Sequence, residues 1–381
     1  MRIEADWIRA PHLQRVMAML EAGGHRALLV GGCVRNALIG AGVSDMDIAT
    51  DAHPERVIAL AQAAGLKPVP TGIEHGTVTV IADHVPHEIT TFRRDIETHG
   101  RHATVAFSDR IEEDAARRDF TMNALYARAD GIVLDPLGQG LADLGRRHLR
   151  FVGDPETRIR EDYLRILRFF RFTAWYGAPD LGIDAEGLAA CAANSAGLET
   201  LSRERIGAEM RKLLAAPDPA PAVAAMQVTG VLAQILPGAD VRTLAPLVHL
   251  EGDLPPEPLR RLAALGGVEA PERLRLSVKE ARALAAIRAA LADDGPDAAT
   301  AYRYGLSPAR DAALIRAASL AQPLPEDWQN RLEYGATRVF PVKPADLMPA
   351  LSGPALGQRL RELEARWIAS GFTLTRDELL R

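Results

Sequence analysis

The sequence is poor in cysteine and has no long apolar run. Its 381 residues include only Cys33 and Cys191, too few for a disulfide framework or a zinc site of four cysteines. No uncharged apolar stretch approaches the roughly 20 residues that span a bilayer. The charged N-terminus, MRIEADWIRAPHLQRV, lacks the apolar core and cleavage site of a signal peptide. The sequence therefore predicts a cytoplasmic protein without a membrane span.

An excess of positive charge is also missing. The chain has 45 Lys and Arg against 50 Asp and Glu, which gives a net charge of −5. Domains that bind nucleic acid are often strongly basic, and no segment of this chain is a basic block. Any binding of RNA must therefore depend on a local patch.

Metal sites built from histidine are not indicated either. The pairs His84/His87 and His99/His102 have spacings that metal ligands can have, but neither lies near a cysteine or a His-Asp dipeptide. We expect these four residues to be surface histidines.

The chain is long enough for two to four compact units, and its character changes near residue 154. Before that point, short strand-like runs alternate with helical patterns such as the one over 54–65, opened by Pro54 and closed by Gly65. The strand-like runs lie at 27–32, 45–50, 77–83 and 87–92. After it, strand signals almost vanish, and Ala/Leu/Arg-rich helical patterns continue to the end. The polar segment 94–103 is predicted to be an exposed, mobile loop.

Two carboxylates lie close together in the segment DMDIAT, residues 45–50. On a strand, Asp45 and Asp47 would point to the same face while Met46 and Ile48 point into the core. Two carboxylates on one face repel each other unless a cation lies between them, and Mg²⁺ is a suitable cation. An isolated pair of this kind is more often a solvated strand end. Glu88, in the strand-like run HEITTF, is the best candidate for a third carboxylate, and a surface role for it is equally compatible with the sequence.

A glycine turn precedes the acidic pair in VGGCVRNALIG, residues 30–40. Gly31 and Gly32 let the backbone come close to a phosphate, and the helix that follows offers free N–H groups. Arg35 near the start of that helix can complete a triphosphate clamp. The alternative is an ordinary strand-to-helix turn.

The segment RRDFTMNALYA, residues 117–127, carries further polar candidates. Arg118 could hold a phosphate, and Asp119 could accept a hydrogen bond from a ribose hydroxyl. Alternatively, Asp119 caps a helix formed by the residues that follow it.

The segment RIREDYLRILRFFRF, residues 158–172, is predicted to be one helix with charged residues at spacings of three, namely Asp162, Arg165, Arg168 and Arg171. One interpretation is a set of ion pairs on a solvated helix face, strengthened by Glu161 four residues before Arg165. The other is base recognition. Cytosine and adenine both present an amine beside an unprotonated ring nitrogen, so Asp162 can accept from the amine while Arg165 donates to the nitrogen. Uracil and guanine would be excluded.

Taken in order, these segments resemble a known family. The motifs GGCVRNALIG, DMDIAT, HEITTFR, GRHA, RRDFTMNAL, DPLGQGLADL and EDYLRILRFFRF are similar to those of the class II tRNA nucleotidyltransferases. This family includes CCA-adding enzymes, their C-only and A-only variants, and bacterial poly(A) polymerases. The resemblance is dense over residues 28–172 and weaker through 202–214 and the C-terminal part.

The resemblance implies a fold and a division of the chain. An α+β nucleotidyltransferase head of the polymerase-beta-like type would cover residues 1–150. An all-helical neck that recognises the base would cover 151–215, and a helical body and tail that bind RNA would cover 216–381. The partner would be the acceptor arm and 3′ end of tRNA, and no obligate protein partner is indicated.

The resemblance also implies roles for individual residues. Asp45 and Asp47 would bind two Mg²⁺ ions, Gly32 and Arg35 the triphosphate of CTP or ATP, and Asp162 with Arg165 the base. The remaining nucleotide-binding positions would be Arg118, Asp119, Asn123, Arg168 and Arg171. Residues 95–103 resemble the family's flexible loop, associated with the switch from C to A addition. Asn36 departs from the family pattern, which has Asp after the arginine.

These motifs favour full CCA addition to tRNA by metal-assisted phosphoryl transfer. Within the family, the alternatives are a poly(A) polymerase or an enzyme that adds only CC or only A. An RNA-binding protein with a decayed active site is less consistent with the sequence, because such a protein does not need Asp45 and Asp47. A metal-dependent phosphohydrolase is disfavoured because no His-Asp cluster is present.

Overall fold

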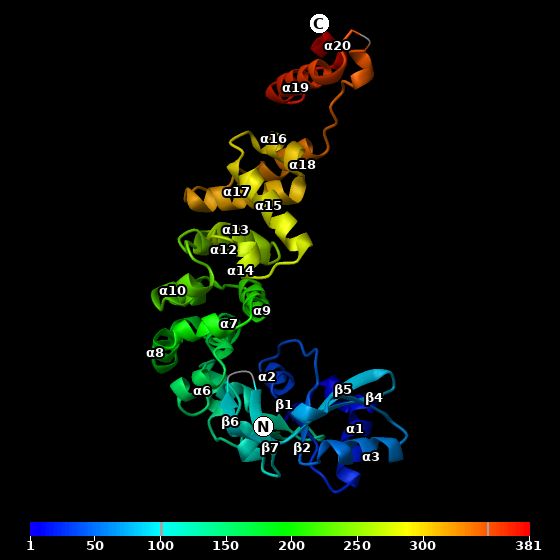
Figure 1. The fold of residues 1–381 in the computed structure, drawn as a ribbon, viewed down its shortest axis with the longest axis vertical. Coiled ribbons are helices and arrows are strands. Elements are labelled where there is room, and N and C mark those ends of the chain that lie inside the picture. The colour runs from blue at the N-terminus through cyan, green and yellow to red at the C-terminus, as the bar shows by residue number, and fades with distance from the viewer. Residues whose placement is uncertain (100–101, 349) are drawn as a thin grey trace. The chain divides into compact units, whose positions relative to one another are not determined.

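A computed structural model describes residues 1–99, 102–348 and 350–381. The chain forms two compact units. Unit 1 consists of Met1–Leu213 and Ala222–Ile235, and unit 2 of Leu214–Pro221 and Leu236–Arg381. The strands lie in unit 1, in the blue to cyan part of the chain (Figure 1).

Unit 1 is built on a seven-stranded mixed sheet with the order β3-β4-β5-β2-β1-β8-β9. Its strands are β1 (Leu28–Val30), β2 (Ile48–Thr50), β3 (Lys67–Gly72), β4 (Thr77–Ala82), β5 (Val85–Thr91), β8 (Tyr126–Ala127) and β9 (Val133–Leu134). Neighbouring strands are antiparallel except β2 and β5, which are parallel with Ile48 opposite Ile89. This parallel pair brings two sequence-distant segments side by side at the centre of the sheet.

Helices α1 (Pro11–Ala22) and α3 (Pro54–Ala63) pack against β4 and β5 (Figure 1). Both begin with proline at the first helical position, where its missing N–H is no loss. The apolar residues of α1 at helical spacing, such as Leu13 and Met17, are fully buried, as the pattern predicts.

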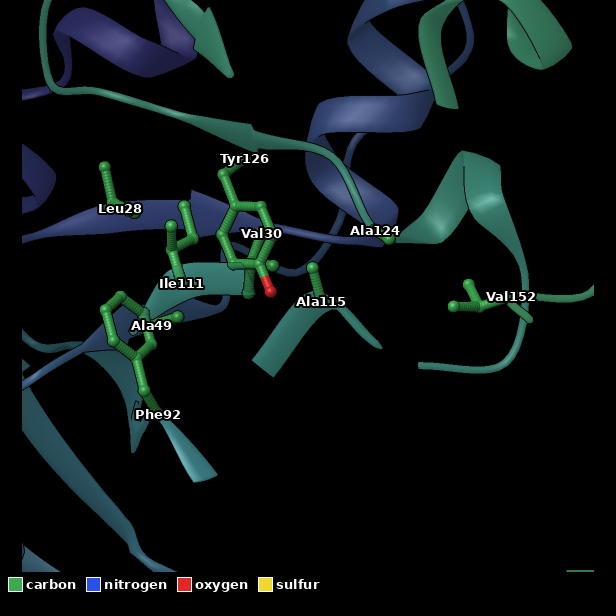
Figure 2. Packing of buried hydrophobic residues seen from close by; sticks show 9 residues of the cluster. All are labelled: Leu28, Val30, Ala49, Phe92, Ile111, Ala115, Ala124, Tyr126 and Val152. Carbon is green, nitrogen blue, oxygen red and sulfur yellow. The ribbon is translucent and has the colours of Figure 1, made fainter. Parts of the chain in front are cut away.

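The other face of the sheet is covered by a cluster of apolar side chains around Tyr126 (Figure 2). Val30 of β1 and Ala49 of β2 meet Ala115 of helix α4 (Ile111–Ala116) in this cluster. Figure 2 shows the Tyr126 ring beside Val30, with its hydroxyl group on the side of Ala115. The hydroxyl of this buried tyrosine needs a polar partner, and that partner lies in the candidate site.

Residues 94–99 and 102–103 form strands, so the predicted loop is wrong there. Strands β6 (Arg93–His99) and β7 (His102–Phe107) pair in an antiparallel two-stranded sheet, with Arg93 opposite Phe107. Such strands satisfy each other's backbone N–H and C=O groups, so a segment with almost no apolar residues can still form them. Residues 100 and 101 of the predicted loop lie outside the described residues.

His87 is buried, contrary to the expected surface position. It shares the buried face of β5 with Ile89 and Thr91. Its ring stacks on His12 with 5.0 Å between the centroids, and its Nε2 lies 3.0 Å from His12 Nδ1. Burial and the neighbouring His12 lower the pKa of His87 to about 4, so the ring is neutral at physiological pH.

The remaining helices of unit 1 lie wholly or mostly within it. They are α2 (Gly32–Leu38), α5 (Gly140–Arg146), α6 (Pro155–Glu161), α7 (Leu164–Tyr176), α8 (Ala185–Ala193), α9 (Arg203–Leu214), α10 (Ala220–Val228) and α11 (Val231–Ile235). The last residue of α9 and the first two of α10 lie in unit 2. In the described part of the chain no strand follows β9, so the predicted change to helix is confirmed.

The predicted single helix over 158–172 is interrupted. Helix α6 ends at Glu161, and Asp162 has extended backbone dihedrals (φ −152°, ψ 104°). The Asp162 carboxylate accepts a hydrogen bond from Leu164 N at 3.1 Å. Aspartate competes with the helix through such local contacts, so α7 starts anew at Leu164.

The described part of unit 2 consists of helices and their connecting loops, without a strand. Its helices are α12 (Leu244–Glu251), α13 (Pro258–Leu265), α14 (Ala270–Arg273), α15 (Val278–Ala292), α16 (Asp297–Tyr304), α17 (Leu306–Ser319), α18 (Trp328–Ala336), α19 (Gly353–Ala369) and α20 (Arg376–Leu380). Helix α19 has Pro354 in its first turn and buries Leu363 and Trp367. None of the described helices is both long and apolar enough to cross a lipid bilayer.

A buried ionic cluster lies inside unit 2. Arg260 donates to Glu251 at 2.9 Å and to Asp311 at 2.8 Å, and Arg261 donates to Glu251 at 2.6 Å. All four side chains are almost inaccessible to solvent. Arg261 also donates to the backbone carbonyl of Leu214 at 2.7 Å. Each buried charge therefore has a partner, as burial requires.

Candidate active site

Three carboxylates gather at one end of the parallel strand pair. Strand β2 begins only at Ile48, so Asp45 and Asp47 precede the strand and do not lie on it as predicted. Because Ile48 pairs with Ile89, the preceding residues Asp47 and Glu88 are neighbours. Asp45, Asp47 and Glu88 are all exposed at this end of the sheet.

The electrostatics of Asp47 show how close these groups are. Partial desolvation by the surrounding protein raises the pKa of Asp47, and the negative charges of Glu88 and Asp45 raise it further. Arg118 acts in the opposite direction. The folded chain thus gathers like charges that a cation would relieve. Within the described residues, however, no three His, Cys, Asp or Glu side chains form a ready-made metal cage.

The glycine turn lies between β1 and α2. Gly31 has φ 74° and ψ −120°, a conformation that favours glycine, and its N–H donates to the Leu125 carbonyl at 3.1 Å. A side chain at this position would begin 3.4 Å from Arg118 Nη1. The absence of a side chain at Gly31 therefore lets the arginine lie directly against the turn. Gly32 then begins helix α2.

Arg118 is held by two buried groups that sequence reasoning missed. Its Nε donates to the Tyr126 hydroxyl at 3.0 Å, and its Nη2 donates to Asp114 at 3.0 Å. Tyr126 in turn donates to Asp114 at 2.6 Å. Burial would raise the pKa of Asp114, but Arg118 and Arg117 outweigh it and lower that pKa. These contacts leave the Nη1 side of Arg118 facing Gly31.

Arg35 on α2 is almost fully buried, with 6% of its surface exposed. Its Nη1 donates to Asn123 Oδ1 at 2.5 Å, and its Nε and Nη2 donate to Asn36 Oδ1 at 3.1 and 2.8 Å. Burial lowers the pKa of Arg35, though an arginine remains charged. Asn36, the departure from the family pattern, is therefore a neutral acceptor for this guanidinium.

Asp119 links the segment after α4 to helix α7. Its Oδ1 accepts from Phe120 N at 2.8 Å and from Asn123 Nδ2 at 3.0 Å, and its Oδ2 accepts from Arg168. Burial would raise the pKa of Asp119, but Arg168 and the Asn123 hydrogen bond outweigh it and lower the pKa, so the carboxylate is ionised. The alternative of a helix cap is not observed, because Phe120 occupies the cap position of the short 3₁₀ helix Thr121–Asn123.

Asp162 and Arg165 are not paired with each other. Asp162 accepts from Arg205 of α9 at 2.7 Å. Arg165 donates to Glu161 and to the backbone carbonyl of Arg158, the latter at 2.7 Å. Asp162 and Arg165, the two groups predicted to read the base, are thus each held by a different ion-pair partner.

Three arginines surround Phe172 on α7. The guanidinium carbons of Arg35, Arg168 and Arg171 lie 5.0, 5.2 and 4.4 Å from the centre of its ring. Arg171 also donates to Glu209 of α9 at 2.6 Å. The sequence does contain a pattern that predicts part of this cluster. Arg168, Phe172 and Tyr176 are four residues apart, and this spacing places side chains on one face of a helix.

We call the group Asp45, Asp47 and Glu88, at one end of the β2–β5 pair, the acidic edge. A mixed sheet carries this acidic edge, with a glycine turn beside it and an arginine-rich helix next to both. This arrangement is that of a nucleotidyltransferase. Known proteins agree with this class. Residues 27–150 match the family model described as the poly A polymerase head domain. Residues 180–242 match the model described as the probable RNA and SrmB-binding site of polymerase A.

Related proteins match over nearly the whole chain. The mitochondrial CCA tRNA nucleotidyltransferase 1 of Danio rerio is 34% identical over 92% of this chain and 85% of its own. The CCA-adding enzyme of Geobacillus kaustophilus is 34% identical over 93% of this chain and 81% of its own. The crystal structure of the Bacillus stearothermophilus CCA-adding enzyme in complex with CTP has a TM-score of 0.70 and 28% identity, covering 94% and 93%. The chain belongs to the CCA tRNA nucleotidyltransferase family, which confirms the resemblance and the predicted fold class.

Proposed function

We propose that this chain adds C, C and A to the 3′ end of tRNA, using CTP and ATP as substrates. Relatives that carry this activity in their names match more than nine tenths of this chain. The observation that carries the proposal is the acidic edge formed by Asp45, Asp47 and Glu88 beside the Gly31 turn. An acidic edge next to a phosphate grip suits transfer of a nucleotide from a triphosphate.

Asp45 and Asp47 would hold two Mg²⁺ ions. Support comes from the crowding of carboxylates that raises the pKa of Asp47. Mg²⁺ is usually bound by one or two carboxylates together with water and substrate phosphates, so a complete protein cage is not needed. When bound, the ions would lower the pKa of the RNA 3′-hydroxyl and neutralise charge on the departing pyrophosphate. Glu88 would add negative charge beside the Asp47 carboxylate.

The glycine turn and its arginines would hold the phosphates. Gly31 and Gly32 allow close approach of the backbone, and Arg118 and Arg35 supply positive charge on either side. Charged donors fixed before the nucleotide arrives lose little freedom on binding it, which favours a defined position of the α-phosphate.

Asp119 would contribute to nucleotide binding through its neighbours. A carboxylate offers about four acceptor positions. Those of Asp119 are taken by Phe120, Asn123 and two donors of Arg168. We therefore propose that Asp119 does not bond the ribose directly. It would instead orient Asn123 and Arg168 towards the nucleotide.

Asp162 and Arg165 would select the base, and Arg171 would support the site from helix α7. Glu161 and Arg205 hold these two groups apart from each other, so both can meet the edge of an incoming cytosine or adenine. A wrong base would leave mispaired polar groups, each costing about 1–3 kcal/mol.

The acceptor arm of tRNA would lie against the helical part of the chain. In this proposal, residues 1–150 form the catalytic head, 151–215 the neck, and 216–381 the RNA-binding body and tail. We also propose a cytoplasmic location, which two buried free cysteines would suit because that compartment is reducing.

The test is incubation of the full chain with tRNA transcripts that end before CCA, after C and after CC, with each labelled nucleotide in turn. We expect C, C and A to be added once each and in order, and UTP and GTP to be rejected. An enzyme that stops after CC, or that adds only A, would identify a partial activity. Failure to extend any transcript would refute the proposal.

A poly(A) polymerase is the second candidate, because the model matched by residues 27–150 is described by that name. It predicts repeated addition of A to RNA without regard to the CCA end.

The variant Asp45→Asn tests the acidic edge for either activity. It should leave the melting temperature and RNA binding intact and remove nearly all incorporation. A near-normal rate in Asp45→Asn would contradict the assignment of the acidic edge.

A further inference from the structure

The hydrogen bonds of Arg35 reach beyond the head to the last residue of helix α7. Arg35 Nη2 donates to the hydroxyl of Tyr176 at 2.8 Å. The guanidinium carbon also lies 4.0 Å from the centre of the Tyr176 ring, closer than to the ring of Phe172. Tyr176 therefore both bonds the arginine and stacks with it.

The acceptors of Arg35 share one property, which is that none carries a charge. Four of its five N–H donors are taken by the two asparagines Asn36 and Asn123 and by Tyr176. Asp119 carries a negative charge nearby but is bonded to Arg168. A buried cation is costly without a counter-charge, and neutral acceptors fix its orientation without neutralising it. The positive charge of Arg35 is thus available to a negatively charged ligand.

The position of Tyr176 gives this contact a consequence for substrate binding. Helix α7 also carries Arg165 near its start and Arg168 in its middle. If α7 shifts to accommodate a base, the Tyr176 hydroxyl moves with it and changes the position of the Arg35 guanidinium. Gly177 ends the helix directly after Tyr176, so the tyrosine is placed by the last turn and not by a loop.

We propose that Tyr176 is a positioning residue for Arg35, which fixes its guanidinium for the triphosphate and couples phosphate binding to the base-reading helix. The inference rests on the proposed function, because it takes a nucleoside triphosphate as the ligand. It extends that function by assigning a role to a hydroxyl that is not part of any motif in the sequence.

The test compares binding of inorganic tripolyphosphate and of cytidine to the full chain, each measured by calorimetry in the presence of Mg²⁺. The central variant is Tyr176→Phe, which keeps the ring and removes only the hydroxyl. Losing one hydrogen bond of this kind corresponds to about a fivefold loss of affinity. We expect this loss for tripolyphosphate and no change for cytidine. Thr173→Val is the matched control, since it removes a hydroxyl on the same helix that bonds only to the Phe169 carbonyl.

A double-mutant cycle separates positioning from general weakening. Arg35→Gln should weaken tripolyphosphate binding more than Tyr176→Phe, and adding Tyr176→Phe to it should cause little further loss. Unchanged or tighter tripolyphosphate binding by Tyr176→Phe, an equal loss of cytidine binding, or additive losses would each overturn the inference. A wild-type chain that binds tripolyphosphate in this pattern but does not extend tRNA would instead refute the proposed function.

Discussion

Reversing the charges of the base-reading pair is the most demanding test of base selection. If Asp162 and Arg165 read the amine and ring nitrogen of cytosine and adenine, exchanging them should favour uracil and guanine. The structure shows why this exchange alone will fail. Asp162→Arg would place a guanidinium against Arg205, and Arg165→Asp would place a carboxylate against Glu161.

The size of this conflict can be estimated. Two like charges 4 Å apart repel by roughly 4 kcal/mol at an effective dielectric constant of about 20. The two mismatched pairs together would exceed the gain from correct pairing with the new base, about 1–3 kcal/mol per polar contact. The simple exchange should therefore lower the rate with every nucleotide.

A fourfold variant that adds Arg205→Glu and Glu161→Arg restores both ion pairs with their charges reversed. Glu161 also accepts from Arg158, so Glu161→Arg leaves one repulsion that lowers the rate. We expect the fourfold variant to be slow but to prefer UTP and GTP over CTP and ATP. The assay is single-turnover extension of a tRNA transcript with each nucleotide separately. A matched control is the exchange of Asp327 and Arg331, an exposed ion pair at the start of α18, which should leave base preference unchanged. If the fourfold variant still prefers CTP and ATP, Asp162 and Arg165 do not select the base.

Further predictions follow from the acidic edge, the hairpin and the buried ionic cluster. The folded chain raises the pKa of Asp47, so the charged form of Asp47 destabilises the fold above that pKa. Asp47→Asn should therefore raise the melting temperature at pH 7 in EDTA. A lower melting temperature would contradict the crowding of carboxylates. Replacing residues 97–102 of the hairpin with a Gly/Ser linker should spare C addition and depress the final A, whereas equal loss of both or of neither would argue against a switching role. Glu251→Leu should lower the free energy of unfolding in urea by about 3–5 kcal/mol because it leaves Arg260 and Arg261 buried without their shared carboxylate, and a change below about 1 kcal/mol would show that the cluster is not needed.

The fold and the chemical centre of the site could be predicted because their signals are local. Gly31 needs a backbone conformation that only glycine adopts easily, and the nearby Asp45 and Asp47 supply like charges within a few residues. The strand-like runs follow from their residue types, and the structure has a strand at each of them, although the one in 45–50 begins only at Ile48.

The pairing of charged side chains could not be predicted because it depends on distant segments. Asp119 and Arg168 are 49 residues apart, and Arg35 and Tyr176 are 141 apart. The interruption at Asp162 was missed for a different reason. The charged residues recur there at helical spacing, but Leu164 N donates a hydrogen bond to the Asp162 carboxylate, and this local contact competes with the helix.

The chain passes between its two compact units three times, after Leu213, after Pro221 and after Ile235. Neither unit can therefore be obtained by cutting at one place. A fragment that ends at Leu213 would lack Ala222–Ile235, with the buried Val231, Leu232 and Ile235, and would expose the apolar surface that these residues cover. A fragment that begins at Leu236 would lack Leu214, whose carbonyl binds Arg261. Expression of isolated domains, and their release by a protease, should both be difficult for this chain.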